Sequence, residues 1–524
     1  MFPLFFWENF GTRMLQMNSS SSELDKFLEV ADQFKLGLLM TEMQHPLTKD
    51  LSHIAKRNLP GAIELCNEVD IGAFRKLAKF ESILGALVDD VQDTFKDGGR
   101  VFLIGCGATG RLALCLESWW RRRFPGSNQV RGILAGGDLA LIQSLEKAED
   151  YPEFGKKHLH EANLRPGDLA IGITEGGETS YVIGAINYAR DFCHKNPYIL
   201  YCNEDPILQM VAQRSSNFIV DKKIKNISLP IGPMTLSGST RMQASSVLQF
   251  IVGQALLGNK NFSKDIETLV NHLQSSERTA VLNSLITKES QTYSNCGYIT
   301  YSCSPDLGMT ILTDTTERSP TFGVIGLENI LEKTSPALAN LSILGSNTAI
   351  ECYKLILGRD PHPLEWPDFK GRAGKKRLLG FDLSERNLST RQKTLKNHLS
   401  VEFHRSSSCF EIKYDGEFLK YYSPFSSDSL LDLIDFKLFL NTHSTLCMGI
   451  LGRYESNIMT WVRPNNYKLI DRTIRYASML LEDRKESIPY DKMAQKLFEI
   501  KLEITESESV VERLVNELVV LKID

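Results

Sequence analysis

The sequence predicts an α/β protein with two tandem halves, each a parallel sheet covered by helices on both faces. A helical N-terminal cap and a small C-terminal helical lid flank the halves. Three observations predict this fold. A chain of 524 residues is too long for one ordinary core. Residues 100–123 are typical of a strand, a glycine-rich turn and a helix, and strand and helix patterns then alternate. A second alternation begins at residue 298.

The first element is the stretch Arg100–Arg111, RVFLIGCGATGR. Its glycines let the backbone turn sharply and approach a ligand, and the start of the following helix favours an anion such as phosphate. The stretch alone leaves two interpretations open, a phosphate-binding turn or a plain tight connection. Its glycine spacing also fits a dinucleotide-binding fingerprint. That third interpretation is disfavoured, because residues 119–129 are basic and turn-like where a strand ending in an acidic residue is needed.

Polar or glycine-rich loops follow the predicted strands of the first half, and a fifth such loop, Gly232–Ser245, precedes an apolar helix. In that loop Ser237, Ser239 or Thr240 is a candidate helix cap. Because the carboxyl ends of parallel strands share one sheet edge, we expect the loops to surround one ligand site. The predicted strands are Val101–Gly105, Gly132–Gly137, Leu169–Thr174 and Tyr198–Asn203.

The second half begins with a strand at Tyr298 and a helix leading into Asp314–Gly323. Strand-like segments follow at Leu341–Ser346 and Arg377–Ser384, and Ile458–Leu481 predicts a strand and a helix. The predicted domains are the N-terminal cap (1–92), a first α/β domain (93–260), a helical linker (261–295), a second α/β domain (296–481) and the C-terminal lid (482–524).

Composition limits the classes of function. A net charge of −4 gives no electrostatic reason to bind nucleic acid or a membrane surface. The ten cysteines contain no CxxC pair and no Cys/His cluster, so we expect reduced thiols, no metal site and no cofactor. No apolar run approaches the ~18–20 residues of a membrane span, and the apolar tip at residues 1–7 is too short for a signal peptide. We expect a cytoplasmic protein.

Several motifs occur in the first half in a specific order: GCGATGR, LAGGDLALIQSLEKAED, YVIGAINYA, CN and GSTRM. In this order and spacing they resemble the sugar isomerase (SIS) domain of the N-acetylmuramic acid 6-phosphate etherase family. DTTERSPTFG in the second half resembles that family's acid-bearing signature, and residues 437–472 resemble its C-terminal signature. Two such halves with an HPLTKD entry and a C-terminal lid are similar to the glucokinase regulatory protein family. The resemblance covers about residues 45–480 and implies two tandem SIS domains.

An internal repeat appears when GCGATGRLALCLESW is set over CSPDLGMTILTDTTE, so that Gly110 falls on Gly308. By the resemblance, the first copy keeps the glycine turn but has Trp119 in place of the family's glutamate. The second copy lacks the turn but keeps Glu317. Each copy retains what the other lacks, which predicts one composite pocket between the halves.

This pocket is expected to bind a phosphate at Ala108–Thr109 and to have its acidic end at Glu149 and Glu317. The resemblance adds the loop after the third strand and a lysine of the C-terminal signature. The expected ligand-binding residues are Gly107, Ala108, Thr109, Gly110, Glu149, Thr174, Glu175, Gly176, Glu317 and Lys468.

The chain departs from the etherase pattern at three positions. Gly176 and Glu178 stand where the family has a serine and an arginine, and Gln243 stands in place of a lysine. Losing two cations weakens the charge balance at a phosphate. Glu175 and Glu178 would add repulsion if they faced the phosphate. The favoured interpretation of these two residues is that their carboxylates are solvated and face outward, whereas the resemblance places Glu175 at the ligand.

Two functions fit these features. The favoured one is a sugar-phosphate-sensing regulator, which binds fructose 6-phosphate or fructose 1-phosphate between its halves and modulates a hexokinase or glucokinase partner. This reading follows from the resemblance and from the eroded phosphate loop, and it needs no catalytic residue. The alternative is an etherase that releases lactate, in which Glu149 and Glu317 are the catalytic acid and base.

Overall fold

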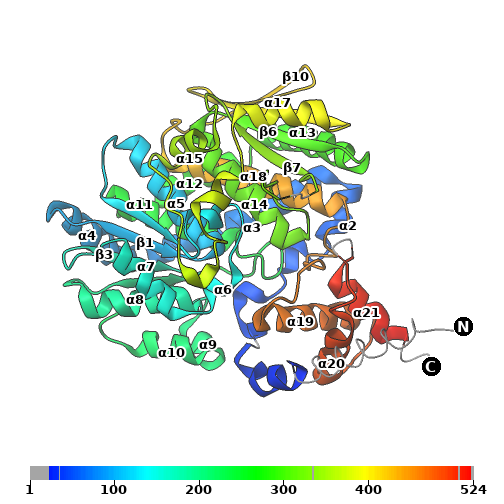
Figure 1. Ribbon diagram of the computed structural model, residues 1–524, viewed down its shortest axis with the longest axis horizontal. Helices are drawn as coiled ribbons and strands as arrows, with labels where there is room; N and C mark the ends of the chain where they lie inside the picture. The colour runs from blue at the N-terminus through cyan, green and yellow to red at the C-terminus, as the bar shows by residue number, and fades with distance from the viewer. Residues whose placement is uncertain (1–22, 35, 333–334, 506–507, 521–524) are drawn as a thin grey trace, which may run out of the picture.

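A five-stranded parallel sheet with strand order β2-β1-β3-β4-β5 forms the centre of the first half (Figure 1). The computed structural model describes residues 23–34, 36–332, 335–505 and 508–520; the predicted apolar tip lies outside them. Four strands confirm the prediction, and the fifth was missed because its sequence, KNIS, has no apolar run. The strands are β1 (Val101–Gly105), β2 (Val130–Leu134), β3 (Leu169–Ile173), β4 (Tyr198–Tyr201) and β5 (Lys225–Ser228).

Helices cover both faces of this sheet. Alternate side chains of β1 therefore join two different apolar clusters: Val101 and Leu103 pack with α4 and α11, whereas Phe102 and Ile104 pack with α8. Strand order reverses between β1 and β3, and the crevice at the carboxyl ends of such strands is where α/β proteins bind ligands. The helices are α3 (Leu59–Leu77), α4 (Glu81–Lys96), α5 (Gly107–Arg123), α6 (Glu146–Glu149), α7 (Pro152–Glu161), α8 (Ser180–Phe192), α9 (Asp205–Val211), α10 (Gln213–Val220) and α11 (Gln243–Leu257), with the short 3-10 turn η6 (Asp138–Leu141).

The second sheet has the order β10-β9-β8-β6-β7. Strands β7, β6 and β8 are parallel, whereas β9 and β10 run antiparallel to their neighbours. The α/β class with two sheet-centred halves is thus confirmed, and the second sheet is mixed. Its strands are β6 (Tyr298–Cys303), β7 (Ala339–Ile343), β8 (His398–Arg405), β9 (Cys409–Tyr414) and β10 (Glu417–Tyr422).

Two predicted strands of the second half are wrong. Residues 375–379 form a short helix, and the chain around Ile458 forms a turn. Strands β8–β10 take their place. In β8 and β9, buried side chains alternate with partly or fully exposed ones. Their hairpin turn, Asp415–Gly416, has positive φ at both residues. Asp-Gly between alternating segments is the signal that identifies such a hairpin.

The internal repeat is visible in the structure. Helix α14 (Pro305–Phe322) follows β6 as α5 follows β1, and the two helices pack against each other. A side chain at Gly110 would overlap Leu134 at the end of β2, and one at Gly308 would lie 2.6 Å from Ile343 at the end of β7. The aligned glycines therefore allow the same close approach of helix to strand in both halves.

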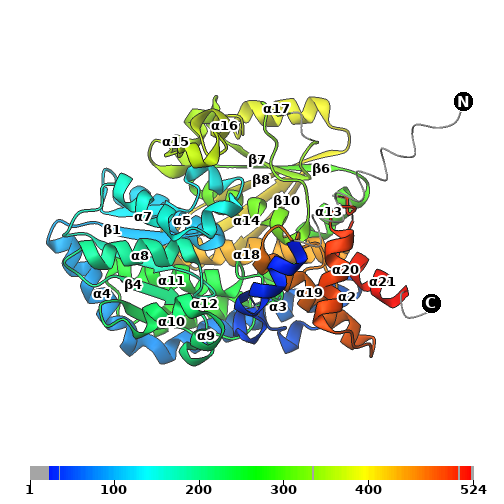
Figure 2. The ribbon, with the colours of Figure 1, turned by 60° about the horizontal axis from the view of Figure 1, so that its bottom comes forward.

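Helix α18 (Leu430–Ile450) passes between the two sheets (Figure 2). It is buried along nearly its whole length. Its buried charged side chains have polar partners, since Asp435 pairs with Arg278 and Lys437 donates to the Arg241 carbonyl. The helix contacts α2, α3, α11, α13 and α14. The helices not yet given are α2 (Leu51–Arg57), α12 (Ser263–Leu273), α13 (Ser276–Ser294), α15 (Ala349–Leu357), α16 (Lys375–Leu379), α17 (Glu385–Thr394), α19 (Tyr467–Asp483), α20 (Tyr490–Ile500) and α21 (Val510–Val520).

The described N-terminal segments, blue in Figure 1, lie beside α19 and α20 from the C-terminal part of the chain. Glu42, in the 3-10 turn η3 (Met40–Glu42), pairs with Arg472 and Arg475 of α19. This contact places the start of α19 beside the sheet edge of the first half. Within the described residues, no helix combines the length and apolar character that crossing a membrane requires.

Candidate functional site

A cavity of about 830 Å³ lies between the halves, at the carboxyl ends of β1 and β3. The first half contributes the turn after β1, the loop after β3 and the loop before α11. The second half contributes the end of α14 and the segment after it, and α19 contributes its first turns. One space is thus bounded by segments that lie more than 400 residues apart in the chain, from Leu39 to Arg472.

The start of α5 forms one wall, where Gly107 and Ala108 line the cavity. Gly107 has a φ of 54°, a conformation that favours glycine. The first N–H groups of a helix have no partner within the helix, so this end is suited to an anion. Thr109 does not line the cavity: its Oγ1 accepts from the Cys106 N–H at 3.1 Å and donates to the Cys106 carbonyl at 3.0 Å. Gly110 packs against β2 and does not reach the cavity either.

The loop after β3 forms the adjoining wall, where Glu175, Gly176 and Glu178 line the cavity. Thr174 does not line the cavity. Its Oγ1 bonds to the Thr179 hydroxyl at 3.0 Å and accepts from the Gly177 N–H at 3.3 Å. The expectation that Glu175 and Glu178 face solvent is wrong, since they are 8% and 3% exposed. Burial raises the pKa of Glu175 to about 8, and the nearby Glu317 carboxylate adds to this effect.

Glu317 enters the cavity from α14 in the second half and forms an ion pair with Arg111 of α5. Arg111 is 1% exposed, and it also donates to the Ala140 carbonyl at 2.7 Å and to the Ser144 hydroxyl at 3.0 Å. The arginine of the GCGATGR motif thus positions the acidic residue of the other half. Sequence reasoning missed this role, because the partner lies 206 residues away.

Lys468 enters from α19 and lies between two carboxylates, paired with Glu178 and 3.7 Å from Glu149. Arg214 pairs with the other oxygen of Glu178. Burial raises the pKa of Glu178, but Lys468 and Arg214 outweigh burial and lower it to about 2. Lys468 of α19 and Arg214 of α10 are therefore both paired with the Glu178 carboxylate at this wall of the cavity.

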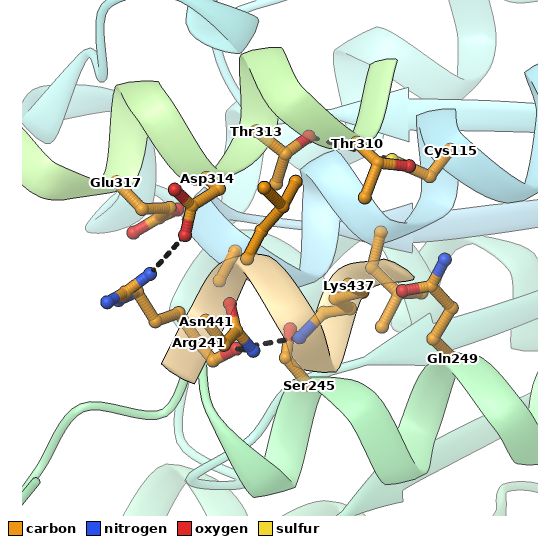
Figure 3. Close-up of a pocket in the computed structure, with 13 residues that line it drawn as sticks. Cys115, Arg241, Ser245, Gln249, Thr310, Thr313, Asp314, Glu317, Lys437 and Asn441 are labelled. Atoms are coloured by element: carbon orange, nitrogen blue, oxygen red, sulfur yellow. Dashed lines mark hydrogen bonds and ion pairs between the residues drawn. The ribbon is translucent and has the colours of Figure 1, made fainter. Parts of the chain in front are cut away.

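The loop before α11 adds residues that were not assigned to the site. Arg241 lines the cavity and donates to Asp314 of α14 at 2.9 Å (Figure 3). Ser239 lines it too, and its buried hydroxyl has no partner among the described residues. The predicted caps in this loop are wrong, because α11 begins after Met242 without a side-chain cap. In the sequence this loop follows the strands of the first half, and that position was the signal that could have assigned Arg241 and Ser239 to the site.

A second, small cavity of about 20 Å³ lies behind the first, between α5, α11, α14 and α18. Figure 3 shows Lys437 of α18 reaching from the right toward Arg241, to whose carbonyl it donates at 2.9 Å. Burial lowers the pKa of Lys437 to about 8, and Arg241 contributes to this shift. Gln243, which stands where the family pattern has a lysine, donates to Asp70 at 2.7 Å.

Of the ten residues predicted to bind the ligand, seven line the large cavity and three do not. Those that line it are Gly107, Ala108, Glu149, Glu175, Gly176, Glu317 and Lys468. Thr109, Gly110 and Thr174 instead hold the two loops in shape, through hydroxyl contacts within the loop or close packing on a strand.

One group among the described residues has metal-binding atoms that converge: Glu289, His443 and Cys447. It lies in the buried core of the second half and does not line the cavity. Glu289 already accepts from the Tyr301 hydroxyl at 2.7 Å and lies 3.2 Å from His443. Glu289 Oε1 and both ring nitrogens of His443 are buried and have no hydrogen-bond partner among the described residues.

Comparison with known proteins gives two kinds of match. The family described as "Glucokinase regulatory protein N-terminal SIS domain" matches residues 83–190. N-acetylmuramic acid 6-phosphate etherases are similar over a larger part. The protein from Bacillus licheniformis is 31% identical over 41% of this chain and 67% of its own length. The one from Caldanaerobacter subterraneus is 32% identical over 42% and 67%, and the one from Rhodopirellula baltica 28% over 43% and 70%.

Among solved structures, the tagatose-6-phosphate ketose/aldose isomerase from Escherichia coli aligns with a TM-score of 0.44 at 12% identity. That alignment covers 76% of this chain and 97% of the isomerase. A protein from Salmonella typhimurium described as a "Putative sugar binding protein" aligns with a TM-score of 0.40. That alignment covers 74% of this chain and 99% of the Salmonella protein.

The expected regulatory function is wrong. The curated relatives at 28–32% identity are named as etherases, which supports the alternative interpretation. The expected fructose phosphate ligand and hexokinase or glucokinase partner followed from the regulatory function and have no support of their own.

Proposed function

The chain belongs to the N-acetylmuramic acid 6-phosphate etherase family, and on this basis we propose that it is a carbon–oxygen lyase that removes the lactyl ether from a phosphorylated N-acetylmuramic acid. The family match covers about two fifths of the chain. The substrate and the reaction are therefore proposed for the whole protein from that part and from the composition of the cavity.

The reaction needs two proton transfers. In the open-chain sugar the ether oxygen is attached to the carbon β to the aldehyde, so loss of the proton from the α carbon expels lactate. A base must take that proton, and an acid must protonate the leaving oxygen. We assign these roles to carboxyl groups of the cavity, with Glu149 and Glu317 as the primary candidates. The observation that carries the proposal is that these two residues come from different halves and line one cavity.

The phosphate is proposed to bind at the start of α5, where Gly107 and Ala108 line the cavity. The N–H groups at the start of a helix and the helix dipole favour an anion there. Arg241 and Lys468 line the cavity from two other segments, each paired with a carboxylate, Asp314 and Glu178 respectively. The buried hydroxyl of Ser239 offers a further polar contact to the sugar.

The test is lactate release from N-acetylmuramic acid 6-phosphate by the purified full chain. We expect release by the natural protein and a loss of about 10²–10⁴-fold in the variants Glu149→Gln and Glu317→Gln. Glu204→Gln, on an exposed residue outside the cavity, is the matched control and is expected to be unchanged. No lactate from the natural protein over a broad pH range would overturn the proposal.

A further inference from the structure

We propose that Glu289, His443 and Cys447 form a structural metal site that binds one divalent transition-metal ion of the Zn²⁺ class. The inference is independent of the proposed function, because the three residues are buried in the second half and do not line the cavity. It departs from the sequence-based expectation of no metal site. That expectation considered cysteine spacing along the chain, whereas these ligands come from two helices that are far apart in sequence.

Two packed helices bring the three side chains together. His443 and Cys447 lie four residues apart on α18, so they project from the same face of that helix. Glu289 lies on α13, which packs against α18. The three residues each offer a donor atom, and these atoms all lie within 4.8 Å of one another. A nitrogen, a sulfur and an oxygen donor thus converge between the two helices.

The contact between Glu289 and His443 has the spacing of two ligands of one ion. Glu289 Oε2 lies 3.2 Å from His443 Nε2, yet neither ring nitrogen of His443 has a hydrogen-bond partner among the described residues. In a hydrogen bond an N–H points at a lone pair, whereas two metal ligands both point a lone pair at the ion. Tetrahedral ligands at about 2.0–2.3 Å from Zn²⁺ lie about 3.3–3.5 Å apart.

The second, independent observation is the number of buried polar atoms without a partner. Glu289, His443 and Cys447 are each 0% exposed. Within the described residues, Glu289 Oε1, both nitrogens of His443 and the hydroxyl of Tyr293, one turn further along α13, have no hydrogen-bond partner. Protein interiors satisfy nearly all buried polar groups. A bound cation explains why free lone pairs gather at this one place.

The charges around the cluster are compatible with a cation. The Tyr301 hydroxyl donates to Glu289 Oε2 at 2.7 Å and accepts from Arg318 at 2.8 Å. Arg318 is itself neutralised, because two of its nitrogens donate to Asp314 at 2.8 and 3.0 Å. A divalent cation, one carboxylate and one thiolate sum to zero, so the occupied site carries no net charge. Tyr301 orients the carboxylate, as outer-shell groups do at metal sites.

The donor set identifies the class of metal and its role. Mg²⁺ and Ca²⁺ take oxygen ligands, whereas imidazole, thiolate and carboxylate together suit Zn²⁺. The ion would tie α13, which lies between the two sheets in the chain, to the central helix α18. Since the ligands are buried, we expect the ion to enter as the chain folds, when the thiol gives up its proton.

The test is the zinc content of the full chain, expressed in zinc-supplemented medium and measured by mass spectrometry after dialysis. We expect one zinc per natural chain and its loss in Cys447→Ala and in Glu289→Gln. The matched control is Cys352→Ala, which should keep the zinc. Cys352 is equally buried on α15, and its thiol donates to a backbone carbonyl as that of Cys447 does. Far-UV circular dichroism confirms that each variant is folded.

Cobalt identifies the ligands directly. Protein expressed with Co²⁺ in place of Zn²⁺ should show the thiolate-to-cobalt absorption band in the natural chain and in Cys352→Ala, but not in Cys447→Ala. If Cys447→Ala does not fold, Glu289→Gln decides through its zinc content, because the amide still accepts from Tyr301. A folded natural chain without zinc, or zinc that both ligand variants retain, would overturn the inference. Lactate release is no part of this test, so its outcome is separate from that of the proposed function.

Discussion

Arg111 of the first half forms a buried ion pair with Glu317 of the second half. The two residues lie on the equivalent helices α5 and α14, which pack against each other. The first repeat copy has lost the family glutamate and the second has lost the glycine turn, and this contact joins what each copy retains. The pair therefore links the two halves at the wall of one cavity.

Replacing Arg111 tests the structural role of this contact. Removing one partner of a buried ion pair leaves an uncompensated charge and costs about 3–5 kcal/mol. We expect Arg111→Ala to lower the free energy of unfolding by that amount, since the Ala140 and Ser144 contacts are lost as well. Urea denaturation measures it. A loss below about 1 kcal/mol, the range of an exposed pair, would contradict the burial of this contact.

Two glycines of the same turn are expected to respond differently to alanine. At Gly110 the new methyl group would overlap Leu134 and lie 2.9 Å from the Gly105 carbonyl, so we expect a loss of stability of about 3 kcal/mol. At Gly107 nothing lies within 4 Å, and the cost is that of a positive φ, about 1 kcal/mol. Only Gly107→Ala places a methyl group at the cavity, so it should weaken sugar-phosphate binding while the fold remains.

The glutamates near α19 predict a loss of stability in acid. Burial raises the pKa of Glu42, but Arg472 and Arg475 outweigh it and lower the pKa to about 2; the pKa of Glu178 is also about 2. A lowered pKa contributes stability that is present above about pH 4.5 and is lost as pH falls toward 2. We expect about 3 kcal/mol from each. In Glu42→Gln the unfolding temperature should depend less on pH across this window; an unchanged slope would contradict the pairing.

Glu175 predicts the opposite dependence. Its raised pKa contributes stability that is present at low pH and is lost as pH rises through about 8. Relative to the natural protein, Glu175→Gln should therefore be more stable at pH 9 than at pH 5. Thermal unfolding at the two pH values measures the difference, with Glu204→Gln as the control. Equal differences at both pH values would show that Glu175 does not hold a proton in the folded state.

Sequence reasoning predicted the first half well because its strands are apolar runs that end in glycine-rich or polar loops. It missed β8–β10, whose short alternating segments carry only the Asp415–Gly416 signal. It also placed Glu175 and Glu178 in solvent. The burial of Glu178 depends on Lys468 and Arg214, which other segments bring to the loop. Local patterns thus locate the loops of the site, whereas long-range partners decide where the side chains point.

The central claim is that both halves contribute to one ligand site. Calorimetric titration of the full chain with N-acetylglucosamine 6-phosphate, which lacks the lactyl ether and is not cleaved, tests it most directly. We predict one binding site per chain, weakened both by Gly107→Ala in the first half and by Glu317→Gln in the second. Two independent sites per chain, or a single site that responds to the first variant and not to the second, would contradict a shared cavity.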